Sequence, residues 1–206
     1  MDDSAKILIL FAHPRFEKSR VNRALLDRIE EVPGVTLRDL YELYPDFNID
    51  VAQEQAALAA HPIIVWHYPL YMYGAPALLK QWMDIVLENG WAHGRGGEAL
   101  KGKILFNALT TGGTREGYAA GGYNRFTIRD FLVPFEQTAA LCQMVYLPPF
   151  AVQGTYLLTE SQLARHAALY RTLLARLAQG NVDVAAMRRF DFLNDWLEHD
   201  PEKCEP

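Results

Sequence analysis

Two kinds of apolar pattern alternate along this chain. Residues 5–11 (AKILILF), 62–66 (PIIVW) and 104–109 are nearly continuous apolar runs, which is typical of parallel strands buried on both faces. Residues 35–40 instead alternate apolar with polar side chains, as a half-exposed edge strand does. A short apolar run at residues 144–146 predicts a fifth strand.

Helices are predicted between these strands. After the first strand, Val21, Leu25 and Ile29 recur every four residues, and charged residues occupy other positions around the helix. Four further helical segments are predicted at residues 51–60, 76–87, 124–141 and 163–177. Strands that alternate with helices in this way predict a three-layer α/β sandwich around a parallel sheet.

One predicted helix and the C-terminal tail stand out by composition. The helix at residues 76–87 has only three polar residues, which indicates burial on several sides or a subunit interface. Residues 181–206 are more charged, and we expect them to form a C-terminal extension rather than a separate domain. The sequence therefore predicts a single domain over residues 1–180.

The composition is that of an ordinary soluble protein of the reducing cytosol. The 206 residues are 50% hydrophobic and 22% charged, and the net charge of −5 provides no broad basic surface for nucleic acid or anionic lipid. No apolar run approaches the roughly 18 residues of a membrane helix, so no direct membrane insertion is expected. Cys142 and Cys204 form no paired motif and the histidines have no zinc-type spacing, so no metal site is expected.

Three short segments stand where a predicted strand ends. They are residues 13–22 (HPRFEKSRVN), 69–74 (PLYMYG) and 110–113 (TTGG). In a doubly wound sheet the carboxyl ends of the parallel strands form the edge at which ligands bind. We therefore expect the three segments to meet at that edge.

The first segment has the residue types of an anion site. Ser19, Arg20 and Asn22 stand at a predicted helix start, where backbone N–H groups favour a phosphate. The alternative is that Ser19 only caps the helix. His13 should face the same crevice, either to support this loop or as an acid–base group. No GxGxxG follows the first strand and no GxxxxGK[ST] occurs, so the usual nucleotide fingerprints are absent.

The other two segments suit a flat ring. Residues 70–73 (LYMY) either form an apolar lid or pack beside a planar ring whose polar edge bonds their backbone amides. Gly112 and Gly113 allow close backbone approach with N–H groups directed at a ligand. Negative charge gathers on the pyrimidine edge of a reduced flavin, and these amides, with the Tyr118 hydroxyl, are placed to stabilise it. Phosphate, flat ring and polar ring edge together indicate a flavin.

At these residues the chain resembles the flavodoxin-like NAD(P)H:quinone oxidoreductases, the family of DT-diaphorase and of the bacterial ancillary proteins of glutathione-gated potassium efflux. The resemblance spans residues 6–178 and rests on HP…SRVN, PLYMYGAPALLKQWMD, GWAHG, LKGK and TTGG…Y, in that order. GWAHGRGGEALKGK and PFEQTAALCQMVYLPPF are most similar to the ancillary subgroup. The resemblance implies a flavodoxin-like three-layer sandwich with a five-stranded parallel sheet of order 2-1-3-4-5.

The resemblance also implies a role for each matching residue. The flavin phosphate and ribityl chain would be surrounded by His13, Ser19, Val21 and Asn22. The isoalloxazine would be held by Pro69, Leu70, Tyr71, Met72 and Tyr73. Its pyrimidine edge would be bonded by Thr110, Thr111, Gly112, Gly113 and Tyr118, of which Gly112, Gly113 and Tyr118 are the expected catalytic groups. The substrate pocket would be walled by Tyr71, Tyr73, Trp91 and Tyr123.

The implied activity is NAD(P)H-dependent two-electron reduction of quinones or related electrophiles, by ping-pong transfer in a homodimer. FMN is favoured by analogy with the ancillary subgroup, and FAD is the alternative. One position departs from the family pattern. Family members have a histidine five or six residues past the tyrosine, whereas this chain has Tyr123 and Asn124 there, so a histidine-assisted proton transfer is not implied.

Two rival functions belong to other classes. As a regulatory ancillary subunit, the protein would be cytoplasmic and would contact a membrane potassium-efflux protein at the inner face of the membrane. A one-electron flavodoxin-type carrier is disfavoured, because such carriers are usually strongly acidic and lack a nicotinamide pocket, whereas this chain has a net charge of −5 and roomy aromatic loops.

Overall fold

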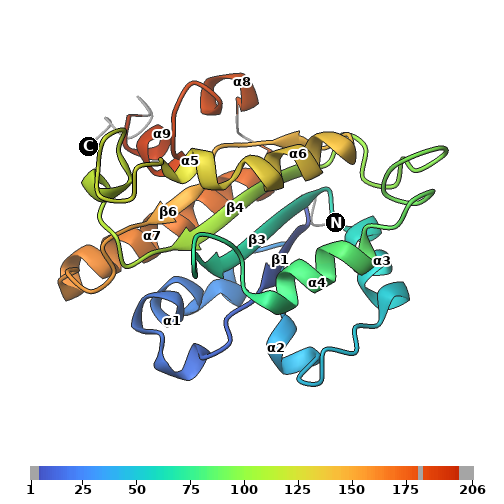
Figure 1. Ribbon diagram of the computed structural model, residues 1–206, viewed down its shortest axis with the longest axis horizontal. Helices are drawn as coiled ribbons and strands as arrows, with labels where there is room; N and C mark the ends of the chain where they lie inside the picture. The colour runs from blue at the N-terminus through green and yellow to red at the C-terminus, as the bar shows by residue number, and fades with distance from the viewer. Residues whose placement is uncertain (1–4, 181–182, 200–206) are drawn as a thin grey trace.

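The computed structural model of this protein describes residues 5–180 and 183–199. A single parallel sheet forms its centre, with strand order β2-β1-β3-β4-β5 and a further strand, β6, that also pairs with β4 (Figure 1). The strands are β1 (Ile7–Phe11), β2 (Val35–Asp39), β3 (Ile63–Pro69), β4 (Ile104–Thr110), β5 (Val145–Tyr146) and β6 (Phe150–Val152). The predicted flavodoxin-like sandwich and its strand order are confirmed.

The sixth strand is the part of the sheet that the sequence did not predict. β5 pairs with the start of β4, through Val145 and Tyr146, and β6 pairs with its end. Pro148 and Pro149 lie between the two pieces. Because proline has no N–H to donate to a ladder, the pair divides what is otherwise one edge strand.

Helices cover both faces of the sheet. The α-helices are α1 (Arg20–Leu26), α2 (Leu40–Leu43), α3 (Val51–Ala60), α4 (Ala77–Val86), α5 (Ile128–Phe131), α6 (Val133–Leu141), α7 (Glu160–Ala178), α8 (Val184–Met187) and α9 (Leu193–His199). Short 3-10 turns are η1 (Phe16–Lys18), η2 (Ile29–Glu31) and η3 (Glu116–Tyr118). The α1, α7, α8 and α9 helices share the hydrophobic core on one face, and α2 to α6 share the core on the other.

The alternation of side chains along the strands explains the continuous apolar runs. In β1, Ile7, Ile9 and Phe11 belong to the core beneath α1 and α7, whereas Leu8 and Leu10 belong to the core beneath α3 and α4. Both faces of the strand are therefore removed from water, which requires an apolar residue at every position.

Several element boundaries differ from the sequence prediction, and the ends of the first helix and of β3 differ for reasons seen in the backbone. The first helix ends at Leu26, since Arg28 adopts a left-handed conformation with φ of 57°, and Ile29 is buried in the following 3-10 turn instead. Strand β3 runs on to Pro69, so the PLYMYG segment begins inside the sheet.

Burial within a single chain explains most of the apolar composition of helix α4. Leu78, Leu79, Trp82, Met83 and Val86 are all buried in the single protomer. Burial on several sides, one of the two explanations offered by the sequence, thus accounts for most of this helix without a second subunit.

Helix α9, in the part of the C-terminal segment that the structure describes, packs against the rest of the chain. Residues 181–182 and 200–206 of the expected C-terminal extension lie outside the described residues. Residues Leu193, Trp196 and Leu197 of α9 join the core beneath α7. The Leu193 N–H donates to Pro149 O at 2.9 Å, and the Ala151 N–H donates to Asn194 Oδ1 at 2.8 Å. These bonds hold α9 against the strand β6.

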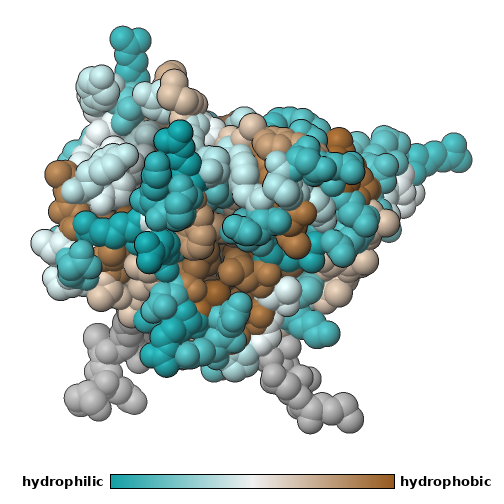
Figure 2. All heavy atoms as spheres, turned by 90° about the horizontal axis from the view of Figure 1, so that it is seen from below, coloured by the Kyte–Doolittle hydropathy of each residue, from teal (hydrophilic) through white to brown (hydrophobic). Residues whose placement is uncertain are grey.

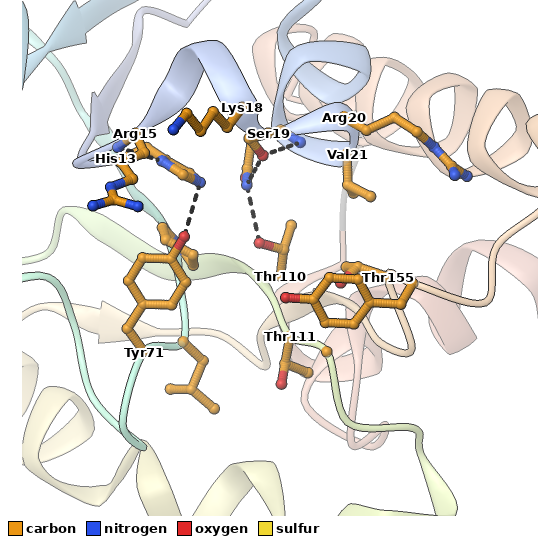
Figure 3. Close-up of a pocket in the computed structure, with 15 residues that line it drawn as sticks. His13, Arg15, Lys18, Ser19, Arg20, Val21, Tyr71, Thr110, Thr111 and Thr155 are labelled. Carbon is orange, nitrogen blue, oxygen red and sulfur yellow. Dashed lines mark hydrogen bonds between the residues drawn. The ribbon is translucent and has the colours of Figure 1, made fainter.

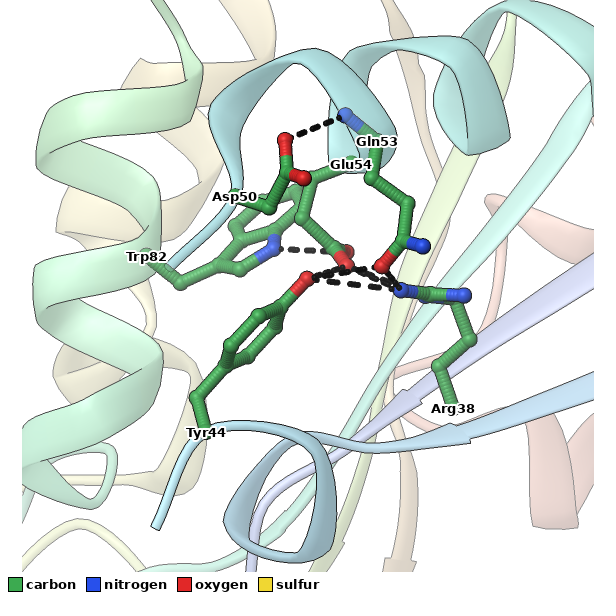
Figure 4. Close-up of polar contacts among 6 residues, drawn as sticks. All are labelled: Arg38, Tyr44, Asp50, Gln53, Glu54 and Trp82. Atoms are coloured by element: carbon green, nitrogen blue, oxygen red, sulfur yellow. Dashed lines mark hydrogen bonds and ion pairs between the residues drawn. The ribbon is translucent and has the colours of Figure 1, made fainter. Parts of the chain in front are cut away.

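A buried carboxylate links β2, α3 and α4 (Figure 4). Glu54 is fully buried, and its Oε1 accepts hydrogen bonds from the Arg38 guanidinium and from the Tyr44 hydroxyl at 2.6 Å. Its Oε2 accepts from the Trp82 indole N–H at 2.9 Å. Burial, followed by the neighbouring Glu54 carboxylate, raises the pKa of Tyr44 to about 12, so this hydroxyl stays a donor.

The face that carries α1 and α2 has an apolar strip between hydrophilic residues (Figure 2). A hollow of about 420 Å³ lies beside the edge strand β2, and its apolar lining includes Phe16, Leu26, Ile29 and Leu37. Arg23, Arg28 and several acidic residues line it as well. The lining of this hollow therefore contains charges of both signs.

Candidate functional site

A hollow of about 550 Å³ opens at the carboxyl edge of the sheet (Figure 3). Its volume falls within the range of roughly 300–1,000 Å³ that small-molecule sites occupy. Four chain segments that follow β1, β3, β4 and β6 supply its lining: His13, Arg15, Lys18, Ser19, Arg20, Val21, Asn22, Pro69, Leu70, Tyr71, Thr110, Thr111, Gly112, Thr155 and Tyr156. The strand-end segments that were expected to meet at this edge do meet there.

The amide of Asn22 organises the polar end of the hollow. Ser19 caps α1 and accepts the Asn22 backbone N–H at 3.2 Å. The Asn22 side-chain Nδ2 donates to Ser19 Oγ at 2.9 Å and to Thr110 Oγ1 at 3.0 Å. Both hydroxyl oxygens are thus accepting bonds, and each keeps its own proton to donate elsewhere. Capping by Ser19 and binding of an anion are therefore compatible.

The charge of the lining is opposite in sign to that of the whole protein. Arg15, Lys18 and Arg20 line the hollow, and no aspartate or glutamate is among its lining residues. The chain as a whole carries a net charge of −5. The Arg20 side chain points outward, where it bonds Leu158 O and lies 3.6 Å from the Glu160 carboxylate (Figure 3). Arg15 and Lys18 are thus the cations that favour an anion inside the hollow.

His13 is buried as a neutral imidazole. Burial lowers the pKa of His13, although the nearby Glu17 carboxylate opposes that shift. Its Nδ1 accepts the Arg15 backbone N–H at 3.1 Å, which leaves the proton on Nε2, 3.4 Å from the Tyr71 hydroxyl. His13 therefore supports both the β1–α1 loop and the Tyr71 ring.

A tight turn presents Tyr71 to the hollow and turns the next residue away. Tyr71 and Gly74 exchange backbone hydrogen bonds of 3.1 and 3.0 Å, and the two residues between them have positive φ angles of 46° for Met72 and 66° for Tyr73. Positive φ is uncommon outside glycine, and such local strain is concentrated at functional sites. Met72 is 92% exposed, whereas Tyr73 stacks on Phe131 with ring centroids 4.9 Å apart.

The backbone of Gly112 and Gly113, called the glycine strip below, follows β4 and lies against two tyrosine rings. A Cβ added at Gly112 would come within 2.6 Å of the Tyr156 ring, and one added at Gly113 would come within 2.7 Å of the buried Tyr118 ring. The Tyr118 hydroxyl lies 3.0 Å from Thr111 Oγ1. Only glycine leaves room for this backbone to pass so close to both rings.

Most of the residues singled out in the sequence line this hollow. They are His13, Ser19, Arg20, Val21, Asn22, Pro69, Leu70, Tyr71, Thr110, Thr111 and Gly112. Gly113 and Tyr118 stand directly behind them, because Tyr118 bonds Thr111 from the buried side.

Four other expected residues lie outside the lining of the hollow in the single chain. Met72 and Tyr123 are each 92% exposed, and Trp91 packs against the core on the α3 and α4 side. The Tyr73 hydroxyl donates to Asn124 Oδ1 at 3.3 Å. Asn124, rather than Tyr123, approaches Gly113, because its Nδ2 would lie 3.3 Å from a Cβ added at that glycine.

Four lining residues were not predicted from the sequence, namely Arg15, Lys18, Thr155 and Tyr156. Thr155 and Tyr156 follow β6, the strand that was not predicted. Had that strand been recognised, the rule that ligands bind beyond the carboxyl ends of strands would have indicated both. Arg15 and Lys18 lie inside the HPRFEKSRVN segment, between His13 and the predicted helix start at Ser19.

Two general features of the described chain bear on its chemistry. No group of three or more histidine, cysteine, aspartate or glutamate side chains among the described residues is placed to hold a metal ion. Within residues 5–180 and 183–199, no helix combines the length and apolarity needed to cross a bilayer.

The carboxyl-edge hollow and the 2-1-3-4-5 sheet define a flavodoxin-like protein. The family model described as having a flavodoxin-like fold matches residues 5–177, and the chain belongs to this family. Among its relatives is the glutathione-regulated potassium-efflux system ancillary protein KefG of Yersinia enterocolitica. The two are 45% identical over 181 residues, which cover 87% of this chain and 98% of the relative.

Two solved structures are similar over most of their length. General stress protein 14 of Treponema denticola, in complex with FMN, has a TM-score of 0.80 and 38% identity, covering 84% of this chain and 99% of that one. An NADPH-quinone reductase from P. pentosaceus has a TM-score of 0.75 and 35% identity, covering 82% of this chain and 97% of that one.

Proposed function

We propose that the hollow binds FMN and that the protein reduces quinones or related electrophiles with NAD(P)H. The observation that carries the proposal is the lining of the hollow. Hydroxyl donors and cations stand at one end of it and a glycine strip at the other, in a chain whose net charge is −5. The FMN complex of general stress protein 14, at 38% identity, favours FMN over FAD.

The residues present fit this cofactor. Ser19 and Thr110 each have a hydroxyl proton to donate, and Arg15 and Lys18 add positive charge on the same side. Hydroxyl donors and cations both form favourable hydrogen bonds with a phosphate, and those from cations are the stronger. Tyr71 and Leu70 offer an apolar wall for a planar ring, and Gly112 has no side chain to obstruct the ring edge.

Bound FMN would supply two-electron transfer from a reduced nicotinamide to an electrophile such as a quinone. The protein's part is to bind, orient and stabilise. The backbone N–H groups of Gly112 and Gly113 would donate to the pyrimidine edge, where charge develops on reduction. Tyr118 would hold Thr111 in place through its 3.0 Å contact. His13 would keep Tyr71 against the ring.

The substrate side of the hollow is proposed to be completed by a second copy of the chain. Met72, Tyr73, Trp91 and Tyr123 carry aromatic or apolar surface that does not line the hollow of one protomer. In a homodimer these residues would wall the space used in turn by the nicotinamide and the quinone. Sedimentation velocity is expected to give about 47 kDa for the dimer, twice the 23.4 kDa of the chain.

The enzymatic proposal is tested by the purified protein itself. Its visible spectrum should be that of an oxidised flavin, and acid release should give the mass of FMN. NADPH or NADH should bleach the spectrum without oxygen, and a quinone added afterwards should restore it. A protein that stays colourless after incubation with FMN would overturn the proposal.

A regulatory role is the second candidate, and the ancillary relatives favour it. The relative from Yersinia enterocolitica is matched over 98% of its length, so the whole of that protein is represented here. On this proposal the protein is cytoplasmic and activates a potassium-efflux protein at the inner face of the membrane. A variant that binds FMN but is not reduced by NAD(P)H should still activate efflux if contact is what matters.

A further inference from the structure

The polar end of the hollow continues into the protein interior. His67 Nε2 lies 3.0 Å from Asn22 Oδ1, and His67 Nδ1 lies 3.2 Å from the Tyr170 hydroxyl. His67 and Tyr170 are fully buried, and Asn22 is 2% exposed. A chain of hydrogen bonds therefore runs from α7, through β3 and α1, to the two hydroxyls of Ser19 and Thr110 that line the hollow.

Two arrangements of protons are compatible with the hydrogen bonds that join Tyr170, His67 and Asn22. In the first, Tyr170 donates to His67 Nδ1, His67 Nε2–H donates to Asn22 Oδ1, and the Asn22 NH₂ donates onward to the hydroxyls. In the second, every bond is reversed and the Asn22 amide is flipped. Ser19 and Thr110 would then donate to Asn22 and would present only lone pairs to the hollow.

The Tyr170 hydroxyl decides between them. Among the described residues, His67 is the only hydrogen-bond partner of that hydroxyl. In the reversed arrangement its proton would be buried with no acceptor, which is unfavourable. The first arrangement satisfies every side-chain donor of Tyr170, His67 and Asn22. It also leaves the protons of Ser19 and Thr110 directed into the hollow.

We propose that the buried Tyr170–His67 pair fixes the orientation of the Asn22 amide and so makes Ser19 and Thr110 donors to a phosphate, whether that of a flavin or free phosphate. His67 and Tyr170 are positioning residues that touch no ligand. The proposal rests on the proposed function for the identity of the flavin, but its test includes a probe that is not a flavin.

The neutral state of His67 supports this arrangement. Burial, and to a smaller extent the nearby His13, lower the pKa of His67 to about 3. The imidazole therefore has one proton at physiological pH. With that proton on Nε2, the ring is an acceptor toward Tyr170 and a donor toward Asn22.

Tyr170→Phe tests the proposal, since it removes the donor and keeps the ring. Dissociation constants for FMN and for riboflavin, which lacks the phosphate, are measured from quenching of flavin fluorescence. We expect FMN to bind about tenfold more weakly, the usual loss when a hydrogen bond to a charged group is weakened. Riboflavin should change by less than about twofold. Equal changes for the two ligands, or no change for either, would overturn the proposal.

Tyr68→Phe is the matched control. Tyr68 is a fully buried tyrosine on the neighbouring position of β3, and its hydroxyl has no hydrogen-bond partner within the described part of the chain. Removing this hydroxyl should leave the ratio of the two dissociation constants unchanged. A ratio that falls as in Tyr170→Phe would show that any buried hydroxyl has this effect, and the proposal would fail.

Two substitutions of His67 test whether a different side chain that can both accept and donate a hydrogen bond preserves FMN binding. A glutamine side chain at this position would be able to accept from Tyr170 and donate to Asn22, so His67→Gln should keep FMN binding close to that of the original protein. His67→Leu can do neither and should weaken FMN, relative to riboflavin, at least as much as Tyr170→Phe. If the two His67 variants bind FMN alike, the direction of the hydrogen bonds between Tyr170 and Asn22 does not determine FMN binding, and the proposal is wrong.

Inorganic phosphate separates this proposal from the proposed function. The original protein without flavin should be stabilised against heat by phosphate, and Tyr170→Phe should lose most of that stabilisation. Phosphate stabilisation without FMN binding would refute the flavin proposal alone. If neither phosphate nor FMN binds, no anion is held at Ser19 and Thr110, and both proposals fall.

Discussion

Two buried polar clusters lie on opposite faces of the sheet, and they differ in how they end. The Glu54 cluster is closed, because Arg38, Tyr44 and Trp82 satisfy both carboxylate oxygens (Figure 4). The Asn22 cluster contains no charged group, and it ends at Ser19 and Thr110, whose protons have no partner within it. The first uses its hydrogen bonds to hold elements together, and the second presents two of its donors to a hollow.

The difference indicates how a buried polar group can be assigned to stability or to binding. A cluster whose members satisfy one another offers nothing to a ligand, however unusual its burial. A cluster that stops at a cavity with donors left over is suited to recognise an acceptor. Disrupting Glu54 should therefore affect unfolding and leave binding intact, whereas changes along the Asn22 cluster should affect binding.

The largest effect is expected for Glu54→Ala. It leaves the Arg38 guanidinium, which is mostly buried, without its anion, and the stability should fall by about 3 kcal/mol. Chemical denaturation measures the change. Glu31→Ala, which removes an exposed ion pair with Arg28, should leave the unfolding midpoint unchanged.

The FMN dissociation constant of the folded Glu54→Ala protein should equal that of the original. Should this variant not fold, Tyr44→Phe removes a single bond to the same carboxylate and should cost about 1–2 kcal/mol. A loss of FMN affinity without a loss of stability in either variant would contradict the separation of the two clusters.

The next effect is a pH dependence that belongs to His67. Its pKa is about 3 in the folded protein, against an ordinary value of 6.5, so the unfolded chain binds the proton more readily. The contribution of His67 to the free energy of unfolding is complete above pH 6.5. Below that pH it falls by about 1.4 kcal/mol per pH unit, so that about 2 kcal/mol of it is lost at pH 5. His67→Gln should remove this part of the slope.

Urea denaturation of both proteins between pH 7.5 and 5 measures that difference. His13 and His166, whose pKa values are also lowered by burial, are present in both proteins and cancel. Parallel stability curves for the two proteins would show that His67 is protonated in the folded state.

A side chain added to the glycine strip should weaken FMN binding by an intermediate amount. In Gly113→Ala the new Cβ would lie 2.7 Å from the Tyr118 ring, which is buried and bonded to Thr111, so the strip must move. FMN should bind about tenfold more weakly. Gly117→Ala is the matched control, since the nearest atom to its Cβ is 3.5 Å away. Similar losses in both variants would show that the strip is not a specific contact.

The smallest effect is expected for a single cation of the lining. Lys18→Gln should weaken FMN about threefold at low salt and have no effect on riboflavin, and the difference should shrink as salt screens the charge. Arg23→Gln removes one charge from the same helical region, but Arg23 lines the hollow beside β2 instead. An equal loss in that variant would mean that net charge, and not the lining, attracts the phosphate.

Much of the fold followed from the sequence, because buried parallel strands and amphipathic helices have clear periodicities. The boundaries of α3 were predicted to the residue. The strand β6 was not predicted, because its three residues follow two prolines and carry no periodic signal of their own. Because β6 was not predicted, the sequence also did not predict that Thr155 and Tyr156 line the hollow.

The site was predictable as a meeting of segments but not as a network. His67 carries no motif, and Tyr170 could be recognised only as one apolar position of a long helix. Their contact joins residues 103 positions apart in the chain. The orientation of the Met72 side chain likewise depends on a positive φ that nothing in the PLYMYG segment specifies.

The most direct measurement is a crystal structure of the protein grown with FMN. We expect density for the phosphate within hydrogen-bonding distance of the Ser19 and Thr110 hydroxyls, with the ring between Tyr71 and the Gly112–Gly113 backbone. A flavin bound with its phosphate elsewhere, or a hollow in which no flavin is found at saturating FMN, would contradict it.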